Sequence, residues 1–429
     1  MVAACGSAFL GGTGLGHGVL IRARRAWLAW LLAGLVAWLP VLGAGAAEPP
    51  RYTGPWDVQK LKEVPHATFG AAEGLVQEVY YEGEPWGGKP TRVFAYLARP
   101  EKAQGKVPGM VLVHGGGGTA FAEWATLWAK RGYAAIAMDL AGCGPGRKRL
   151  PDGGPGQDEH AKFRDFSETE ADQMWTYHAV AAVIRGHSLL AAQPGVDPQR
   201  IGITGISWGG YLTCIVAGLD DRLKVAVPVY GCGFLHENSA WLPQFARMSP
   251  AQRQRWIRLF DPSRYLPGVR IPILFMNGTN DFAYPLDSYQ KSYRLVPGPV
   301  DVRIEVRMPH SHPDGWAPKE IGLYVDSVLR GGEPLPRLGP LEVRGGRIFA
   351  AVTARIPLVK GELHYTLDQG PWQKRNWQTQ PASLGQGVVK AELPPKRPIV
   401  FYLSVTDQRG AMMSTQHAEL QSEATTGGS

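Results

Sequence analysis

The sequence predicts an α/β fold, a mostly parallel sheet with helices on both faces, followed by a smaller all-β domain. Up to Arg330, short apolar strands alternate with helical segments, the pattern of a sheet covered on both faces. After Arg330, only short alternating segments remain. The 429 residues include 54 Gly and 35 Pro, and are 44% apolar and 19% charged. This composition indicates a loop-rich globular protein and excludes a disordered or fibrous one.

The first 47 residues have the features of an export signal. Three arginines at 22–25 precede the uncharged stretch 26–39, and small residues fill positions 44–47. We therefore expect a signal peptide (1–47) and a secreted or periplasmic mature protein. A retained membrane anchor is the alternative, which Pro40 disfavours. The paired arginines also resemble a twin-arginine signal faintly.

Charge and cysteine content limit the partners of the mature chain. Without the three signal arginines, 45 basic residues become 42 against 37 acidic ones, which leaves a net charge of +5. The basic residues are scattered, so we expect no nucleic-acid binding, and no stable membrane association once the signal is cleaved. The remaining cysteines, Cys143, Cys214 and Cys232, can form one disulfide at most, and we expect small buried thiols.

The α/β domain is expected to span residues 48–334. Two strands, 75–81 and 91–98, flank a loop rich in Gly and Pro. The alternating part that follows is expected to have strands at 110–113, 133–138, 200–205, 225–230, 271–276 and 302–307, and helices at 121–131, 168–192 and 209–219. A segment rich in Trp, Arg and Gln, 235–262, interrupts the alternation. We expect it to be a helical insertion that walls a substrate pocket.

The all-β domain is expected to span residues 335–421, with a disordered tail at 422–429. Its turn-separated strands at 347–352, 362–367, 388–393 and 399–405 fit a sandwich of immunoglobulin or fibronectin type. Tyr365, Trp372 and Trp377 cluster around one turn and could stack on sugar rings. A small sandwich needs large side chains in its core, so we expect at least two of them to be buried there. The domain is then an accessory without catalytic residues.

A nucleophile motif lies between a predicted strand and a predicted helix. Gly205-Ile206-Ser207-Trp208-Gly209 matches the G-x-S-x-G pattern in the strand–turn–helix context that gives the pattern its meaning. A serine on such a strained turn leaves no room for side chains two residues away, and the helix N-terminus favours negative charge nearby. The sequence therefore predicts Ser207 as a nucleophile.

A serine nucleophile needs a base and an acid that orients it, and here they follow in the order Ser, Asp, His. Asp281 comes directly after strand 271–276, at the edge of the sheet where ligands and catalysts are presented. Asn280 and Asp287 are alternatives that fit turn chemistry better. We expect His312 to be the base, because the loop must travel a few residues past strand 302–307 before turning back, and His310 is the alternative base.

An oxyanion hole needs two backbone N–H donors. One is expected from Trp208, the residue after the nucleophile. The other is expected from the glycine-rich segment after strand 110–113, where bare backbone can approach an oxyanion. Gly116 and Gly117 are the candidates.

Two rival motifs point to a cofactor or a metal. Residues 115–120 satisfy G-x-G-x-x-A, and Asp139 follows about twenty residues on, as in a dinucleotide site. Two strands upstream, His114 in front and the downstream nucleophile motif argue against that interpretation. His310, His312 and Asp314 resemble the start of a zinc site, but the histidine expected next is a glycine. We expect neither cofactor nor metal.

Residues from about 75 to 330 resemble the α/β-hydrolase superfamily, in its dienelactone hydrolase, acetyl xylan esterase and prolyl-oligopeptidase-like branch. The resemblance rests on the segments 114–119, 205–210, 277–281 and 310–312. It implies an eight-stranded, mostly parallel sheet and hydrolysis of an ester or amide through an acyl-serine. Many relatives have Gly before the catalytic histidine, where this chain has Ser311.

Together these features predict an exported serine hydrolase that acts on a small-molecule or saccharide ester. Acetyl or other short acyl esters of carbohydrate are favoured by the resemblance and by the Trp-rich insertion. A serine peptidase is the first alternative. A catalytically silent extracellular binding protein is the second, against which the complete set of Ser, Asp and His argues.

Overall fold

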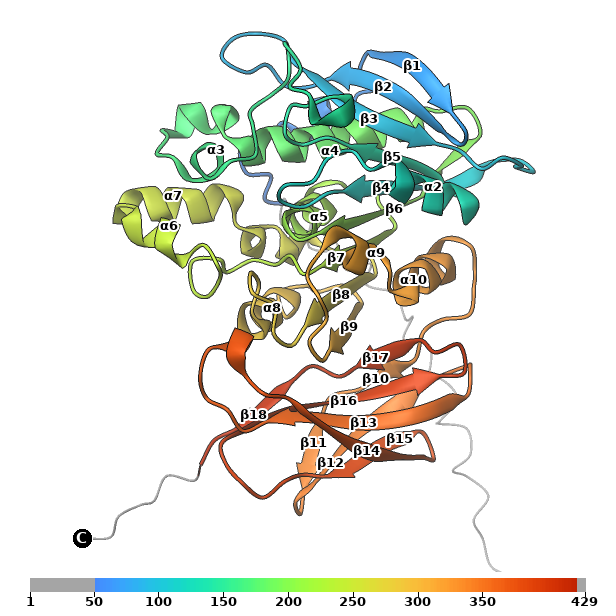
Figure 1. Ribbon diagram of the computed structural model, residues 1–429, viewed down its shortest axis with the longest axis vertical. Helices are drawn as coiled ribbons and strands as arrows, with labels where there is room; N and C mark the ends of the chain where they lie inside the picture. The colour runs from blue at the N-terminus through green and yellow to red at the C-terminus, as the bar shows by residue number, and fades with distance from the viewer. Residues whose placement is uncertain (1–50, 423–429) are drawn as a thin grey trace, which may run out of the picture. The chain divides into compact units, whose positions relative to one another are not determined.

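The computed structural model describes residues 51–422, and its centre is one large sheet (Figure 1). The spatial order is β1-β2-β3-β5-β4-β6-β7-β8-β9, parallel from β5 to β9 and antiparallel among β1, β2, β3 and β5. The strands are β1 (Ala67–Glu73), β2 (Val76–Glu82), β3 (Arg92–Ala98), β4 (Val107–Val113), β5 (Ala134–Met138), β6 (Val196–Ile206), β7 (Val225–Val229), β8 (Ile273–Gly278) and β9 (Val300–Glu305). The α/β fold class is confirmed, and β1 adds one strand to the expected eight.

Helices cover both faces of this sheet (Figure 1). On one face lie α2 (Ala122–Lys130) and α10 (Lys319–Leu329), and on the other α4 (Trp175–Ala191), α5 (Trp208–Leu219) and α8 (Leu286–Tyr293). Every residue of α5 is buried, because the helix lies between the sheet, α4 and the segments that follow β7. Its all-round apolar sequence is what such a position requires.

The helix expected at 168–192 is shorter than predicted. Glu168–Gln173 forms a 3₁₀ helix, η2, and α4 starts only at Trp175. Met174 between them is extended, with φ −87° and ψ 145°. Ser167 and Glu170 form a capping box on η2, which starts a separate helical segment at this point.

Further helices, most of them short, lie in the segments outside these elements. They are α1 (Val58–Leu61), η1 (Pro145–Arg147), α3 (Glu159–Phe163), α6 (Leu242–Arg247), α7 (Pro250–Phe260), η3 (Pro262–Arg264), η4 (Leu266–Gly268) and α9 (His312–Trp316). Helices α6 and α7 lie within 235–262, where the sequence indicates a helical insertion. Trp256 of α7 stacks on Phe163 with ring centroids 5.3 Å apart, which ties the insertion to α3.

The C-terminal region consists of short antiparallel strands, as predicted. They are β10 (Arg337–Leu338), β11 (Glu342–Arg344), β12 (Arg347–Thr353), β13 (Leu358–Thr366), β14 (Gln378–Gly385), β15 (Val388–Glu392), β16 (Ile399–Asp407), β17 (Met412–Ser414) and β18 (Ala418–Leu420), with a 3₁₀ turn, η5, at Trp372–Lys374. One layer contains β13, β16, β17 and β18, the other contains β11, β12 and β15, and β14 pairs with both. Ile348, Leu363, Val389 and Phe401 form part of the core of this region.

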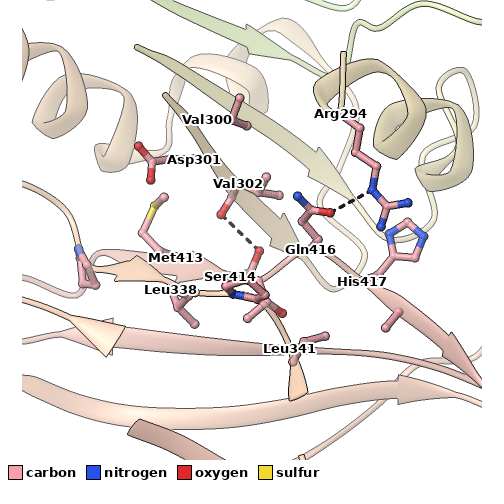
Figure 2. Close-up of a pocket in the computed structure, with 15 residues that line it drawn as sticks. Arg294, Val300, Asp301, Val302, Leu338, Leu341, Met413, Ser414, Gln416 and His417 are labelled. Carbon is pink, nitrogen blue, oxygen red and sulfur yellow. Dashed lines mark hydrogen bonds between the residues drawn. The ribbon is translucent and has the colours of Figure 1, made fainter. Parts of the chain in front are cut away.

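The C-terminal region pairs with the free edge of the α/β sheet. Ser414 of β17 faces Val302 of β9 in an antiparallel pair. The Ser414 hydroxyl accepts from the Ile304 N–H at 2.9 Å. It donates to the Val302 carbonyl at 3.3 Å (Figure 2). A cavity of about 440 Å³ lies beside this pair, with Arg294 and His417 on its wall. None of the predicted site residues lines it.

Two of the three C-terminal aromatic residues are buried, but outside the core of the sandwich, where the sequence analysis expects them. Trp372 and Trp377 are buried, whereas Tyr365 is partly exposed. Trp372 packs edge-on against His417, with ring centroids 5.3 Å apart, and Trp377 packs against Tyr402 at 5.6 Å. Both tryptophans belong to the core cluster that includes the α/β domain, so they join the two regions.

Two of the three cysteines beyond the predicted signal are buried, as expected, and the third is not. Cys214 and Cys232 are buried, Cys143 is partly exposed, and all three are free thiols.

A buried charge cluster at the end of α5 should make a large contribution to stability. Asp220 is fully buried and accepts hydrogen bonds from Arg222 at 2.8 and 2.7 Å and from His187 at 2.8 Å. Burial alone raises the pKa of Asp220, but these hydrogen bonds outweigh it and hold the pKa well below its ordinary value. Its contribution to stability is therefore present above about pH 4 and is lost as the pH falls through the folded-state pKa.

We expect Asp220→Asn to lower the free energy of unfolding by about 3 kcal/mol at neutral pH, because it leaves the partly buried Arg222 without its counter-charge and the buried His187 without its carboxylate partner. Urea denaturation followed by tryptophan fluorescence measures this change. Asp221→Asn is the matched control, since Asp221 is exposed and pairs with Lys62 at the surface. The control should change stability by less than about 1 kcal/mol. Equal effects of the two variants would contradict the assignment.

Candidate active site

Ser207 lies on a sharp turn between β6 and α5. Its backbone has φ 58° and ψ −120°, a strained conformation for a residue with a side chain. The turn is held by backbone hydrogen bonds: the Ser207 N–H donates to the Val229 carbonyl, and the Tyr211 N–H donates to the Ser207 carbonyl, both at 2.9 Å. The strained turn therefore presents the Ser207 hydroxyl at the carboxyl edge of the sheet.

The glycines on either side of Ser207 are required by close packing. A Cβ at Gly205 would lie 2.1 Å from the carbonyl oxygen of Gly209, and a Cβ at Gly209 would lie 1.9 Å from the carbonyl oxygen of Val113. Both distances are far below van der Waals contact with backbone atoms that cannot move away. The G-x-S-x-G pattern thus has the steric reason that the sequence suggests.

Asp281 follows β8 and is buried. Its Oδ1 accepts from the N–H groups of Ala283 at 2.9 Å and Tyr284 at 2.7 Å. These bonds fix the carboxylate and leave Oδ2 for a histidine. Asn280 and Asp287, the alternatives, are engaged elsewhere: Asn280 donates to backbone carbonyls of residues 372–375, and Asp287 accepts from Asn238.

The histidine that contacts Asp281 is His310, not His312. His310 Nδ1 lies 2.6 Å from Asp281 Oδ2. The His310 ring lies between Tyr230, whose ring centroid is 4.2 Å away, and Phe282, at 4.7 Å. With Nδ1–H donated to the carboxylate, Nε2 carries the lone pair of a base. Among residues 51–422, neither this Nε2 nor the Ser207 hydroxyl has a hydrogen-bond partner, and both residues line one cavity.

His312 occupies a different place, which corrects the expectation that Asp281 orients it. It begins helix α9, where the Ser311 hydroxyl accepts from the Asp314 N–H and caps the helix. Its Nε2 accepts from the Gly115 N–H at 2.9 Å, and its ring packs on Phe121. Burial, with His114, His310 and Arg147 nearby, lowers the pKa of His312 to about 4, so it is neutral at ordinary pH.

The glycine-rich loop after β4 lies opposite the turn that carries Ser207. Gly116 lines the same cavity as Ser207 and Trp208, and a Cβ on Gly116 would lie 3.1 Å from the Trp208 ring. Gly117 is not among the residues that line this cavity, and its carbonyl accepts from Arg147. Of the two candidate glycines, the structure therefore brings Gly116 to the site.

His114 holds this loop in place. It is buried, its Nδ1 lies 2.7 Å from the Gly115 carbonyl, and its Nε2 accepts from the Leu140 N–H at 2.8 Å. Burial lowers the pKa of His114 to about 4, so the ring stays neutral and can make both bonds. Asp139, the acidic residue of the dinucleotide-like pattern, accepts instead from the N–H groups of Ala141 and Cys143.

The cavity that holds Ser207 is small and partly aromatic. Its volume is about 270 Å³, and its wall includes Trp208, Trp241 and Phe282 together with His310 and His312. Trp241 precedes α6, so the insertion contributes to the wall as the sequence indicates. Trp241 packs edge-on against Trp208, with ring centroids 4.5 Å apart. Such walls leave room for a small group beside Ser207.

Sequence reasoning missed the contribution of the C-terminal region. Gln373, Lys374 and Arg375 of the η5 turn line a second cavity of about 380 Å³, which adjoins the first and shares Phe282 and His310 with it. No motif in the sequence marks these residues. The signal that was available is the cluster of aromatic and basic residues at 372–377, which the sequence analysis considered only for sugar stacking or core packing.

Neither a metal-binding cluster nor a membrane-spanning helix is present among the described residues. Within residues 51–422, no group of three or more His, Cys, Asp or Glu side chains is arranged to hold a metal ion. In the same range, no helix combines the length and apolar character needed to cross a membrane. The predicted signal peptide (1–47) lies outside the described residues, as does all of the predicted tail (422–429) except its first residue.

Comparisons with known proteins show similarity to esterases and peptidases. Residues 57–265 match the family model of acetyl xylan esterases (AXE1). The acetyl esterase Axe7A of Xylanibacter ruminicola is 23% identical over 221 residues, which cover 49% of this chain and 50% of that protein. The uncharacterized peptidase YuxL of Bacillus subtilis is 26% identical over 221 residues, covering 47% of this chain and 30% of its own. The chain thus spans about half or less of these curated relatives.

Two solved structures show the same fold. The acetyl xylan esterase from Paenibacillus sp. R4 has a TM-score of 0.52 and 22% identity, over 63% of this chain and 92% of its own. Acetyl xylan esterase 1 from Thermoanaerobacterium sp. JW/SL YS485 has a TM-score of 0.51 and 19% identity, over 64% and 96%. The sheet order, the turn at Ser207 and these matches show that the chain has the fold of the α/β-hydrolases.

Proposed function

We propose that this protein is a serine hydrolase that removes acetyl or other short acyl groups from carbohydrate through an acyl-serine. The observation that carries the proposal is one arrangement: Ser207, on its strained turn, shares a cavity with His310, whose Nδ1 lies 2.6 Å from the buried Asp281. A hydroxyl, an imidazole and a carboxylate in this order are the parts of nucleophilic acyl transfer.

The proposed reaction has two steps. Ser207 Oγ attacks the ester carbonyl while His310 Nε2 takes its proton, and Asp281 stabilises the imidazolium that forms. The oxyanion is bound by the N–H groups of Gly116 and Trp208. His310 then returns the proton to the leaving alcohol. In the second step water, activated by the same imidazole, releases the acid and restores the Ser207 hydroxyl.

The size of the acyl group follows from the walls of the cavity. Trp208 and Trp241 fill the space beside Ser207, and the cavity is about 270 Å³. An acetyl group fits beside two indole rings, whereas a long acyl chain would need one of them to move. The match of residues 57–265 to acetyl xylan esterases and the likeness to Axe7A support the same acyl group and a carbohydrate alcohol.

The proposal includes the cellular location of the enzyme and the domain boundaries of the chain. The basic and apolar pattern of residues 1–47 supports export and cleavage, which would make the enzyme secreted or periplasmic. An ester of a polysaccharide is then met outside the cytoplasm. The division into a signal (1–47), a hydrolase domain (48–334) and a β-sandwich domain (335–421) stays a prediction.

Covalent labelling and a substrate panel test the function. We expect a fluorophosphonate probe to label the folded protein at Ser207, located by mass spectrometry of the labelled peptide. We expect acetate release from acetylated xylan oligosaccharides and from p-nitrophenyl acetate. Hydrolysis should fall at least about tenfold from the acetyl to the octanoyl p-nitrophenyl ester, because the longer chain cannot enter beside Trp241.

Two other outcomes would reassign the protein. Cleavage of dipeptide amides without hydrolysis of esters would make it a peptidase, which the likeness to YuxL suggests as the second candidate. Absence of labelling in a sample whose fluorescence and circular dichroism are those of folded protein would indicate a binding protein without catalysis.

A further inference from the structure

The second cavity lies on the histidine side of the reaction centre. It has a volume of about 380 Å³ and adjoins the cavity of Ser207 through Phe282 and His310, which line both. Because His310 would protonate the leaving alcohol, the alcohol half of a substrate lies toward this histidine. A group attached to that half is therefore the part of a substrate that can reach the second cavity.

The wall of this cavity is rich in positive charge. Arg307, Lys374 and Arg375 line it, together with Asn280, Gln373 and the buried Asp281. The carboxylate of Asp281 is the one acidic group on the wall, and its two oxygens are already engaged by Ala283, Tyr284 and His310. In the described part of the chain, none of the three cations forms an ion pair with an acidic side chain.

Arg375 is a buried cation with an unused donor. It is 8% exposed, its guanidinium lies 3.8 Å from the Trp372 ring centroid, and its Nε donates to the Gly370 carbonyl at 2.9 Å. Its Nη1 is buried without a hydrogen-bond partner among the described residues. Burial lowers the pKa of Arg375, although Glu419, Asp287 and Asp368 act in the opposite direction. An arginine stays charged under these conditions, so Arg375 adds positive charge to the wall of the cavity.

The turn that carries these cations is fixed beside the reaction centre. Asn280 Nδ2 donates to the carbonyls of Trp372, Gln373 and Arg375, at 3.3, 3.2 and 2.8 Å. Asn280 is the direct neighbour of Asp281 in the chain. Arg307 Nη2 donates to Asn376 Oδ1 at 3.1 Å, which ties the other wall of the cavity to the same turn. The position of the cations is therefore built into the contact between the C-terminal region and the α/β domain.

We propose that this cavity, which we name the cationic subsite (Arg307, Lys374 and Arg375), binds a carboxylate on the alcohol half of the substrate. The substrate class is then an acylated sugar acid, or an acylated sugar that carries a uronic acid next to the ester. The inference rests on the proposed function, since it places the leaving alcohol by the role of His310. It gives the C-terminal region a part in substrate choice without a part in the chemistry.

Matched aryl acetates test the subsite. The probes are meta-acetoxybenzoate and meta-acetoxybenzamide, which share the acetyl group and the ring and differ in the charge of the leaving group. We expect wild-type kcat/KM to be about tenfold higher for the benzoate. The double variant Arg307→Gln/Lys374→Gln, whose two side chains are exposed, should remove this preference by raising KM for the benzoate while kcat for the benzoate is kept. Lys390→Gln, an exposed lysine on β15, is the charge control and should keep the preference.

A change of ionic strength and a second pair of esters distinguish the subsite from the alternatives. Raising the ionic strength from about 0.05 to about 0.5 M should reduce the preference for the benzoate in the wild type and not in the double variant. Equal rates on the two probes in the wild type, or a preference that survives the double variant, would overturn the subsite while ester hydrolysis itself stands. No hydrolysis of any acetate would refute the proposed function instead. A gain for the p-nitrophenyl monoester of adipic acid over p-nitrophenyl hexanoate would move the carboxylate to the acyl half and overturn the assignment.

Discussion

Ser207→Ala should lower kcat for p-nitrophenyl acetate by about 10⁵-fold, which corresponds to about 7 kcal/mol of transition-state stabilisation. The substitution removes the hydroxyl that we propose as the nucleophile and leaves the strained turn, the backbone N–H groups of Gly116 and Trp208, and the cavity in place. KM should change little, because the hydroxyl contributes little to ground-state binding. Steady-state assays at saturating p-nitrophenyl acetate measure this loss of kcat.

The loss of Ser207 should also abolish the fluorophosphonate label. Ser383→Ala, in the exposed part of β14, is the matched control and should keep both activity and labelling. Ester hydrolysis that persists in Ser207→Ala at more than about a hundredth of the wild-type rate would show that another group is the nucleophile. Thermal unfolding of the two variants checks that the comparison concerns folded protein.

His310→Ala and His312→Ala should differ by orders of magnitude. His310→Ala removes the imidazole that is bonded to Asp281, and we expect kcat/KM to fall by about 10⁴-fold or more. His312→Ala removes the acceptor of the Gly115 N–H and loosens the glycine-rich loop, so we expect a loss of about tenfold. The ratio of the two losses, measured on p-nitrophenyl acetate, decides which histidine is the base.

The pH profile of His312→Ala provides an independent check of this assignment. The pKa of His312 is about 4, so its titration contributes no step to the activity profile above about pH 5. The profile of His312→Ala should therefore keep the shape of the wild-type profile above this pH. A loss in His312→Ala as large as in His310→Ala, together with a changed profile, would restore His312 as the base.

The fold and the strained turn that carries Ser207 could be predicted because their signals are local. Buried parallel strands are short apolar runs, and the turn at Ser207 needs glycine at 205 and 209 for steric reasons that the sequence displays. Strand β14 escaped prediction because Gln378–Gly385 is largely polar and contains Pro381, so it lacks the alternation of a half-buried strand. β17 and β18 are too short to carry a pattern.

The choice of histidine could not be derived in the same way. His310 and His312 are two residues apart in one loop, and spacing from β9 does not distinguish them. The structure distinguishes them through contacts that are distant in sequence: His312 is held by Gly115 and Phe121, and His310 by Asp281, Tyr230 and Phe282. The cationic subsite depends on the η5 turn in the same way, since the bonds of Asn280 span more than ninety residues.

The pairing of β17 with β9 has a consequence for how the chain refolds. The Ser414–Val302 contact joins residues 112 apart, so it is formed at a high cost in loop-closure entropy and is expected late. Until then β9 is a bare sheet edge, with unpaired N–H and C=O groups that another copy of the chain can use. The rate of intermolecular pairing at β9 rises with protein concentration, whereas the rate of the pairing of Ser414 with Val302 within one chain does not. Dilution during refolding therefore favours the native pairing of β17 with β9 within one chain over aggregates joined through β9.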